Sequence, residues 1–180
     1  MDRVTRAVVR MWGSAGNGTL PPAAKFAQEL QDRCNGDLSL CTPGVSKWSY
    51  GQHLEHLYLS SHYVMDRLQE ALGGDNRDAH MGFWGVGLMV GGFIPRKAFP
   101  TIPPLEPHSG TLEHIEPLQK MLHERLRGIN WGLKEVKASP GKSRHPRMKF
   151  LNSGQWMFFA DIHHRHHLAI MRDIVKAAQA

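Results

Sequence analysis

Histidines at helical spacing near the C-terminus are the side chains of this sequence best suited to bind a metal. Four of the twelve histidines fall in the run His163-His164-Arg165-His166-His167, which lies inside an apolar stretch. At about 3.6 residues per turn, His163 and His167 lie one turn apart on one helix face and can reach the same ion. Burying these two imidazoles without polar partners would cost on the order of a few kcal/mol, so each ring needs a hydrogen bond or a metal. Two alternatives to metal binding are a basic patch exposed to solvent and core histidines whose ring nitrogens are hydrogen-bonded.

A third candidate ligand lies in a second predicted helix, over residues 49–72. Ser49 is the predicted N-cap of this helix, and Gln52 three residues later completes a capping-box pattern. His56 falls in the middle of the helix, at the border between an apolar and a polar face. His53, one turn earlier on nearly the same side, is the competing candidate.

The rest of the chain predicts further helices separated by long connections. Residues 23–33 have the apolar spacing of a short helix, and residues 111–128 that of a longer one, in which Pro117 marks either a kink or the true start. Asn152 or Ser153 is the predicted N-cap of the last helix. No convincing strand is predicted. The pattern indicates an all-α fold, an antiparallel four-helix bundle with long crossover loops.

Three connecting segments have distinctive compositions. Residues 81–94 are apolar but too short and glycine-rich to span a bilayer, so they are predicted to be either buried or a homodimer surface. Residues 95–107 contain several prolines and predict an extended crossover. The basic stretch over residues 134–149 predicts a solvated loop and no nucleic-acid site, because it is rich in Ser, Pro and Gly and lacks stacking aromatics.

Composition describes an ordinary globular protein. The chain has 180 residues, a formal net charge of +6 with dispersed basic residues, 41% hydrophobic residues and two cysteines. This length fits one domain. We expect a cytoplasmic protein with reduced thiols, since no signal peptide or membrane-spanning run is apparent.

Two of these motifs together resemble a known family. Trp48-Ser49 followed by His56-Leu57, with the late pair His163 and His167, is similar to the DinB-like (DinB/YfiT-like) four-helix-bundle superfamily of predicted metalloenzymes. His145-Pro146, the stretch 151–156 and the stretch 93–96 resemble a branch described only as a domain of unknown function. The resemblance covers residues 21–180 and leaves residues 1–20 as an N-terminal extension.

The resemblance implies a bundle in which His56, His163 and His167 bind one divalent metal ion. Zn, Ni, Fe and Mn all accept imidazole ligands, so ligand type does not select among them. The better understood relatives are similar to thiol-dependent transferases, in which the metal activates a low-molecular-weight thiol. The basic loop and Arg165 could meet the carboxylates of such a thiol.

Other residues are predicted to surround this metal. Metal-bound imidazoles usually donate their free N–H to a neighbour, and Asp161 and Glu55 are candidates to accept it. His53 and His166 are predicted either to hold a ligand in place or to meet the substrate. The aromatic side chains predicted to line a pocket are Trp48, Tyr63, Trp84 and Trp156.

The sequence therefore supports three hypotheses about function. The first is a metal-dependent enzyme that activates water or a low-molecular-weight thiol toward a small-molecule substrate, as a hydrolase or a thiol S-transferase. The second is a bundle that binds a metal or a small ligand without turnover. The third is a structural bundle whose histidines are incidental.

Overall fold

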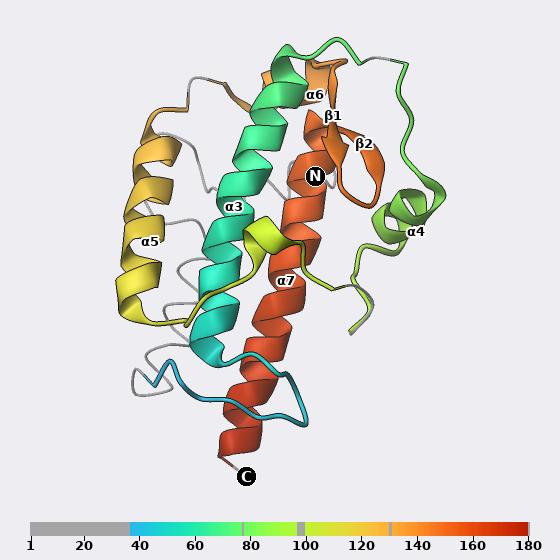
Figure 1. Cartoon of the computed structure of the whole chain (residues 1–180). Coiled ribbons are helices and arrows are strands. Elements are labelled where there is room, and N and C mark those ends of the chain that lie inside the picture. The colour runs from blue at the N-terminus through green and yellow to red at the C-terminus, as the bar shows by residue number, and fades with distance from the viewer. Residues whose placement is uncertain (1–36, 77, 97–99, 130, 180) are drawn as a thin grey trace.

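Two long antiparallel helices form the centre of the molecule (Figure 1). The computed structural model describes residues 37–76, 78–96, 100–129 and 131–179. Helix α3 (Tyr50–Gly73) lies side by side with helix α7 (Ser153–Ala178) along most of its length. Helix α5 (Leu112–Arg127) packs against α3 on the side away from α7 and runs in the same direction as α3 (Figure 1).

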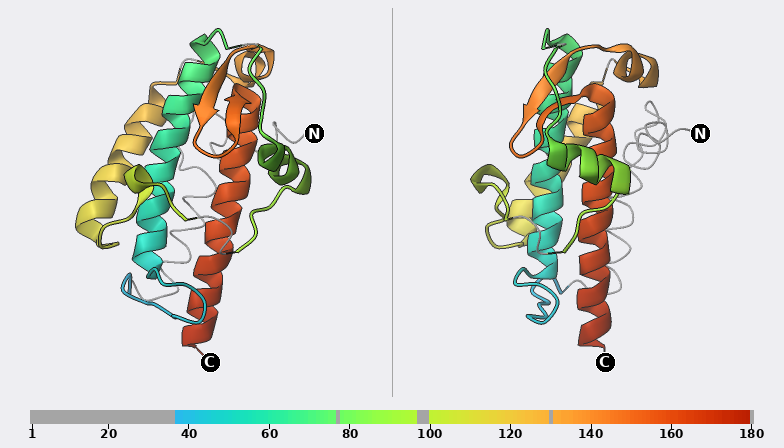
Figure 2. Two further views of the ribbon diagram at one scale, coloured as in Figure 1. Left: turned by 45° about the vertical axis from the view of Figure 1, so that its right-hand side comes forward. Right: turned by 90° about the vertical axis from the view of Figure 1, so that its right-hand side faces the viewer.

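Smaller elements surround this helical core. Helix α4 (Phe83–Gly91) lies on the opposite side of the α3–α7 pair from α5, as Figure 2 shows. A 3₁₀ turn, η1 (Pro103–Leu105), crosses α3, and helix α6 (Leu133–Ala138) precedes a hairpin at the end of the molecule where α7 begins. The hairpin pairs β1 (Lys142–His145) with β2 (Lys149–Asn152) in antiparallel fashion.

Capping boxes fix the starts of both central helices. The box at Ser49 was predicted, whereas for α7 only an N-cap at Asn152 or Ser153 was predicted. The Ser49 side chain accepts the Gln52 N–H, and the Gln52 side chain accepts the Ser49 N–H. Asn152, rather than Ser153, caps α7, with Gln155 as its reciprocal partner. Each box satisfies two backbone N–H groups that a helix start otherwise leaves unpaired.

Apolar side chains from the three long helices form the core. Helix α5 begins at Leu112 and continues through Pro117, so the proline does not mark its start. The helices bury an apolar stripe on their facing sides, which is the expected source of most of their stability. Fully or nearly fully buried core residues include Leu54, Leu68, Ile115, Leu122, Met157 and Met171.

The hairpin and α6 correct the prediction that residues 134–149 form a solvated loop without strands. The protein is mostly helical with a small two-stranded sheet, so the all-α prediction is wrong in this respect. In β1 the buried positions alternate as in any half-buried strand, but Ser143 and His145 occupy them. Because both are polar, the sequence shows no hydrophobic alternation there. The predicted helices and extension before residue 37 lie outside the described residues.

Helix α4 is largely exposed, so the buried alternative predicted for residues 81–94 does not hold for it. Its one buried residue is Gly85, whereas Phe83 is 86% exposed and Trp84 72% exposed. The helix contacts α7 through one side only, and the Gly82 N–H donates to the Met148 carbonyl oxygen at 2.8 Å. None of the helices in the described part of the chain is both long and apolar enough to cross a membrane.

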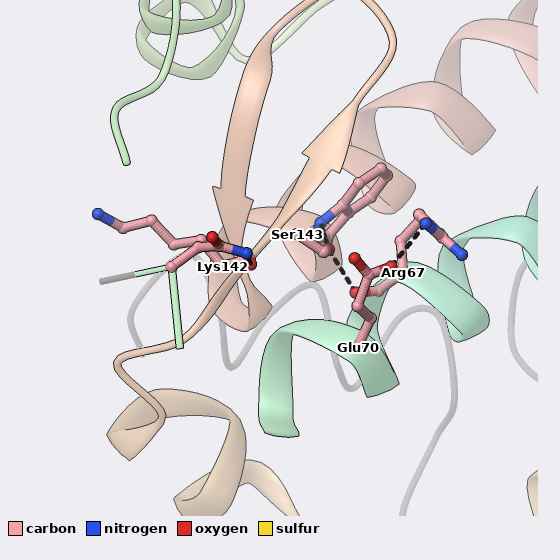
Figure 3. Close-up of polar contacts among 6 residues, drawn as sticks. Arg67, Glu70, Lys142 and Ser143 are labelled. Carbon is pink, nitrogen blue, oxygen red and sulfur yellow. Dashed lines mark hydrogen bonds and ion pairs between the residues drawn. The ribbon is translucent and has the colours of Figure 1, made fainter. Parts of the chain in front are cut away.

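Ser143 ties the hairpin to both central helices. Its hydroxyl accepts the indole N–H of Trp156 at 2.7 Å and donates to the Arg67 carbonyl oxygen at 2.5 Å. Figure 3 shows this contact beside the Arg67–Glu70 ion pair on α3, with Lys142 on the other side of the strand. Ser143 and Trp156 are fully buried. The hairpin is therefore held at a fixed position over the helices.

Replacing Ser143 by Ala should destabilise the fold by about 1–3 kcal/mol, because a buried indole N–H and a backbone carbonyl would lose their partner. Urea unfolding measures this free energy. Ser39→Ala is the matched control at an exposed position, with an expected change within about 0.5 kcal/mol. Equal effects of the two substitutions would contradict the anchoring role of Ser143.

Candidate metal centre

Three histidines converge between α3 and α7. His56 comes from the second turn of α3, nearer the start of the helix than predicted, and His163 and His167 come from successive turns of α7. One ring nitrogen of each lies within 4.8 Å of the others, and among the described residues no other group of three His, Cys, Asp or Glu side chains does so. The Nε2 atoms of His56 and His163 are 3.2 Å apart. The three residues predicted as ligands thus meet at one point.

Hydrogen bonds orient two of these rings. The Nδ1–H of His56 donates to the Leu105 carbonyl oxygen at 2.7 Å, which leaves a lone pair on Nε2 of the neutral ring. The Nδ1 atom of His167 lies 3.0 Å from Nδ1 of His53, and Nε2 of His53 lies 2.9 Å from the Ser46 hydroxyl. His53 therefore holds His167 in place from the side away from His163, one of the two roles predicted for it.

Aromatic rings pack around the three histidines. The ring centre of Trp48 lies 5.0 Å from that of His56 and 6.2 Å from that of His167. Phe159 stacks on His163 at 5.6 Å. These rings restrict rotation of the imidazoles and shield them from water on two sides.

Burial keeps the imidazoles neutral. It lowers the pKa of His163 and of His167 well below the ordinary value of 6.5, and neighbouring histidines lower both further. Burial also lowers the pKa of His56, against a raising effect of the Leu105 carbonyl, and lowers that of His53 to about 3. Neutral imidazole is the form that binds a metal, so the donor set is ready at neutral pH.

A cavity of about 500 Å³ opens over the three histidines. This volume suits a small molecule. Helix α4, the η1 segment and the hairpin turn form its walls above the two central helices. Its lining includes His56, Ser60, Tyr63, Trp84, Leu88, Ile94, Ile102, Leu105, His145, Arg147, Met148, Phe159, His163, His166 and His167.

The two carboxylates predicted to orient an imidazole have other partners. Glu55 is buried and accepts the backbone N–H groups of His108 at 3.0 Å and Gly110 at 2.8 Å. Asp161 accepts from Nε of Arg165 at 3.1 Å. The groups that contact Nδ1 of His56 and of His167 are the Leu105 carbonyl and the His53 ring.

The predicted aromatic pocket is correct only in part. Tyr63 and Trp84 line the cavity. Trp156 is fully buried under the hairpin, and Trp48 packs behind the histidines, so neither lines the cavity. Both side chains are large aromatic rings on a central helix or next to one. Residue spacing alone does not show whether such a ring lies in the core or in the wall of the cavity.

Of the other polar residues near the histidine run, some line the cavity and some do not. His166 lines the cavity and donates its Nδ1–H to the Ile94 carbonyl oxygen at 3.0 Å. Arg165 turns away from the cavity, toward Asp161 and the Gly92 carbonyl oxygen. His164, which follows His163 in the histidine run, faces Ser61 in a separate part of the helix interface.

Sequence reasoning missed His145 and Arg147 as cavity residues. His145 is the last residue of β1 and Arg147 lies in the turn that follows, both within the stretch predicted as a solvated loop. The His-Pro dipeptide at a turn was the available signal.

Comparisons with protein-family models, with curated proteins and with solved structures returned no match.

Acid should destabilise the fold through its buried neutral histidines. Burial lowers the pKa of His164 from 6.5 to about 4, so the unfolded chain takes up a proton at higher pH than the folded protein. The stability present above pH 6.5 is then lost as the pH falls toward 4, by about 1.4 kcal/mol per pH unit for one such group.

His164→Leu should therefore reduce the pH dependence of unfolding by about one proton between pH 6.5 and 4. The Nδ1 atom of His164 is buried without a hydrogen-bond partner, so the substitution removes an unsatisfied polar atom. Urea unfolding over this pH range measures the slope. An unchanged slope would show that His164 is not buried in the neutral form.

Proposed function

We propose that this chain is a metal-dependent enzyme in which His56, His163 and His167 bind one divalent ion at the base of a small-molecule cavity. The observation that carries the proposal is the convergence of three neutral imidazole nitrogens, within 4.8 Å of one another, at the wall of that cavity. Zn, Ni, Fe and Mn all suit such a donor set.

The hydrogen bonds around the rings fit metal binding. With Nδ1 of His56 donating to Leu105, its Nε2 lone pair is available to an ion. For His167 the matching form donates Nδ1–H to His53, whose own Nε2–H then donates to Ser46. Partners of this kind fix the tautomer and direction of metal-bound histidines in proteins.

Three protein ligands leave positions for a substrate, as in catalytic rather than structural zinc sites. When bound, the ion would supply a Lewis acid that activates water or a low-molecular-weight thiol. The chain's own residues orient the imidazoles and keep bulk water away with an apolar wall. With Nδ1–H donated to Ile94, neutral His166 keeps a lone pair on Nε2, the form required of a proton acceptor.

We also propose the DinB-like four-helix bundle as the architecture. The directions of α3, α5 and α7 and the long crossover between α3 and α5 support this assignment. A fourth bundle helix would come from residues 23–33, outside the described residues.

One observation favours binding without turnover as the second candidate. The cavity wall is mostly apolar, and none of its described residues is an Asp or Glu that could act as a general acid or base. Assays of hydrolysis and of thiol transfer on the metal-loaded protein separate the two functions.

Purified protein, prepared without an affinity tag, should contain about one equivalent of a divalent metal per chain. His56→Ala and His163→Ala should each lose this metal, since two remaining imidazoles hold an ion far more weakly. Elemental analysis measures the content. His164→Leu is the matched control, because His164 neighbours His163 on α7 but faces Ser61, and it should retain the metal.

Folded wild-type protein that contains no metal and cannot be loaded with Zn, Ni, Fe or Mn would refute the proposed function. Equal loss of metal in His164→Leu would show that the loss reflects disturbed folding. Circular dichroism of each variant checks that the helices remain.

Replacing His53 by Ala should weaken metal binding by about 10–100-fold without removing a ligand, because His167 would lose the group that orients it. Competition with a chromophoric chelator measures the affinity. Wild-type affinity in His53→Ala would assign His53 to the core alone.

A further inference from the structure

His145 is held in one tautomer by the turn that follows it. It is the last residue of β1, and its Nδ1 accepts the backbone N–H groups of Arg147 and Met148, each at 3.1 Å. A backbone N–H can only donate, so Nδ1 must carry the lone pair. The proton of the neutral ring is therefore on Nε2.

The Nε2–H group of His145 belongs to the cavity. The ring packs against Trp156 at 5.1 Å and edge-on against Phe159 at 4.7 Å, and it lines the same cavity as the three candidate ligands. The residue is 8% exposed, and among the described residues Nε2 makes no hydrogen bond within the protein. The hairpin thus presents one fixed donor to a ligand.

The protonation state of His145 suits a donor. Burial, with a smaller contribution from the charge of Arg147, lowers its pKa to about 4. The two N–H groups that face Nδ1 also oppose a second ring proton there. His145 consequently remains a neutral donor across neutral and mildly acidic pH.

The surrounding charge is positive. Arg147 lines the cavity from the same turn, and one of its guanidinium N–H groups donates to the Pro100 carbonyl oxygen at 2.8 Å. No Asp or Glu is among the described residues that line the cavity. A cation and a fixed donor in one cavity wall complement an anionic acceptor.

We propose that the hairpin turn binds the carboxylate of a small and otherwise apolar ligand, with Nε2–H of His145 donating to it and Arg147 supplying the opposite charge. The apolar body of the ligand contacts the wall formed by Trp84, Leu88 and Phe159. Its other end points to the histidines, and only this orientation rests on the proposed function. His145 is thereby assigned as a specificity-determining residue.

Phenylacetate, which has a carboxylate on an apolar body, is the probe, and neutral phenylethanol is its control. The full chain is used as purified, with isotope-labelled histidine, and nitrogen NMR of the imidazoles follows the titration. Phenylacetate should shift the Nε2–H signal of His145 saturably. In the free protein the same spectrum should place the proton on Nε2.

His145→Asn is the informative variant. The Asn side-chain oxygen can accept the same two backbone N–H groups, as in an Asx turn, but the ring Nε2–H is lost. Phenylacetate should bind at least about tenfold more weakly, the effect of losing one hydrogen bond to a charged group, and phenylethanol binding should change less than about twofold. His123→Asn, on α5 and outside the cavity lining, is the matched control.

Three results would overturn this inference: a ring proton on Nδ1, no saturable shift in the wild-type protein, or equal phenylacetate affinity in wild type and folded His145→Asn. The wild-type spectrum decides the first two even if the variant does not fold. Metal content, measured on the same sample, tests the proposed function separately, so the two failures are distinguishable.

Discussion

Packing of five imidazole rings between α3 and α7, four of them buried and one half-buried, is the constraint on which the rest of this structure depends. A neutral imidazole needs an acceptor for its N–H and a donor or an ion for its lone pair, and leaving either unmet inside a protein is costly. Segments outside the helix pair supply these partners, among them the Ser46 hydroxyl and the Leu105 carbonyl. Apart from Nδ1 of His164, the unmet ring nitrogens concentrate where His56, His163 and His167 meet. The buried rings are those of His53, His56, His164 and His167, and the half-buried ring is that of His163.

The two helices that carry this site could be predicted from sequence because local signals define them. Capping boxes mark the starts of α3 and α7, and the i, i+4 spacing on α7 places His163 and His167 on one face. The choice of His56 over His53 rested on its central position and on the resemblance. The structure brings His56 to the other two and places His53 behind His167.

The remaining features depend on contacts between distant segments, which residue spacing does not reveal. The hairpin was missed because Ser143 and His145, rather than hydrocarbon side chains, fill its buried positions. Glu55 was predicted to orient an imidazole, yet its carboxylate accepts backbone N–H groups of His108 and Gly110, just after the proline-rich segment. Composition likewise identified α4 as apolar without showing that only one side of it would be covered.

Close packing of backbone against backbone links the segment over residues 105–110 to the candidate metal centre. A Cβ on Gly51 would lie 2.0 Å from the Gly110 carbonyl oxygen, so only glycine lets the segment lie flat on the first turn of α3. The same segment carries the Leu105 carbonyl that fixes His56. What holds this segment on α3 therefore also holds the His56 ring. An ion bound by that ring would favour the seated segment, and the seated segment would raise the affinity for the ion by the same factor.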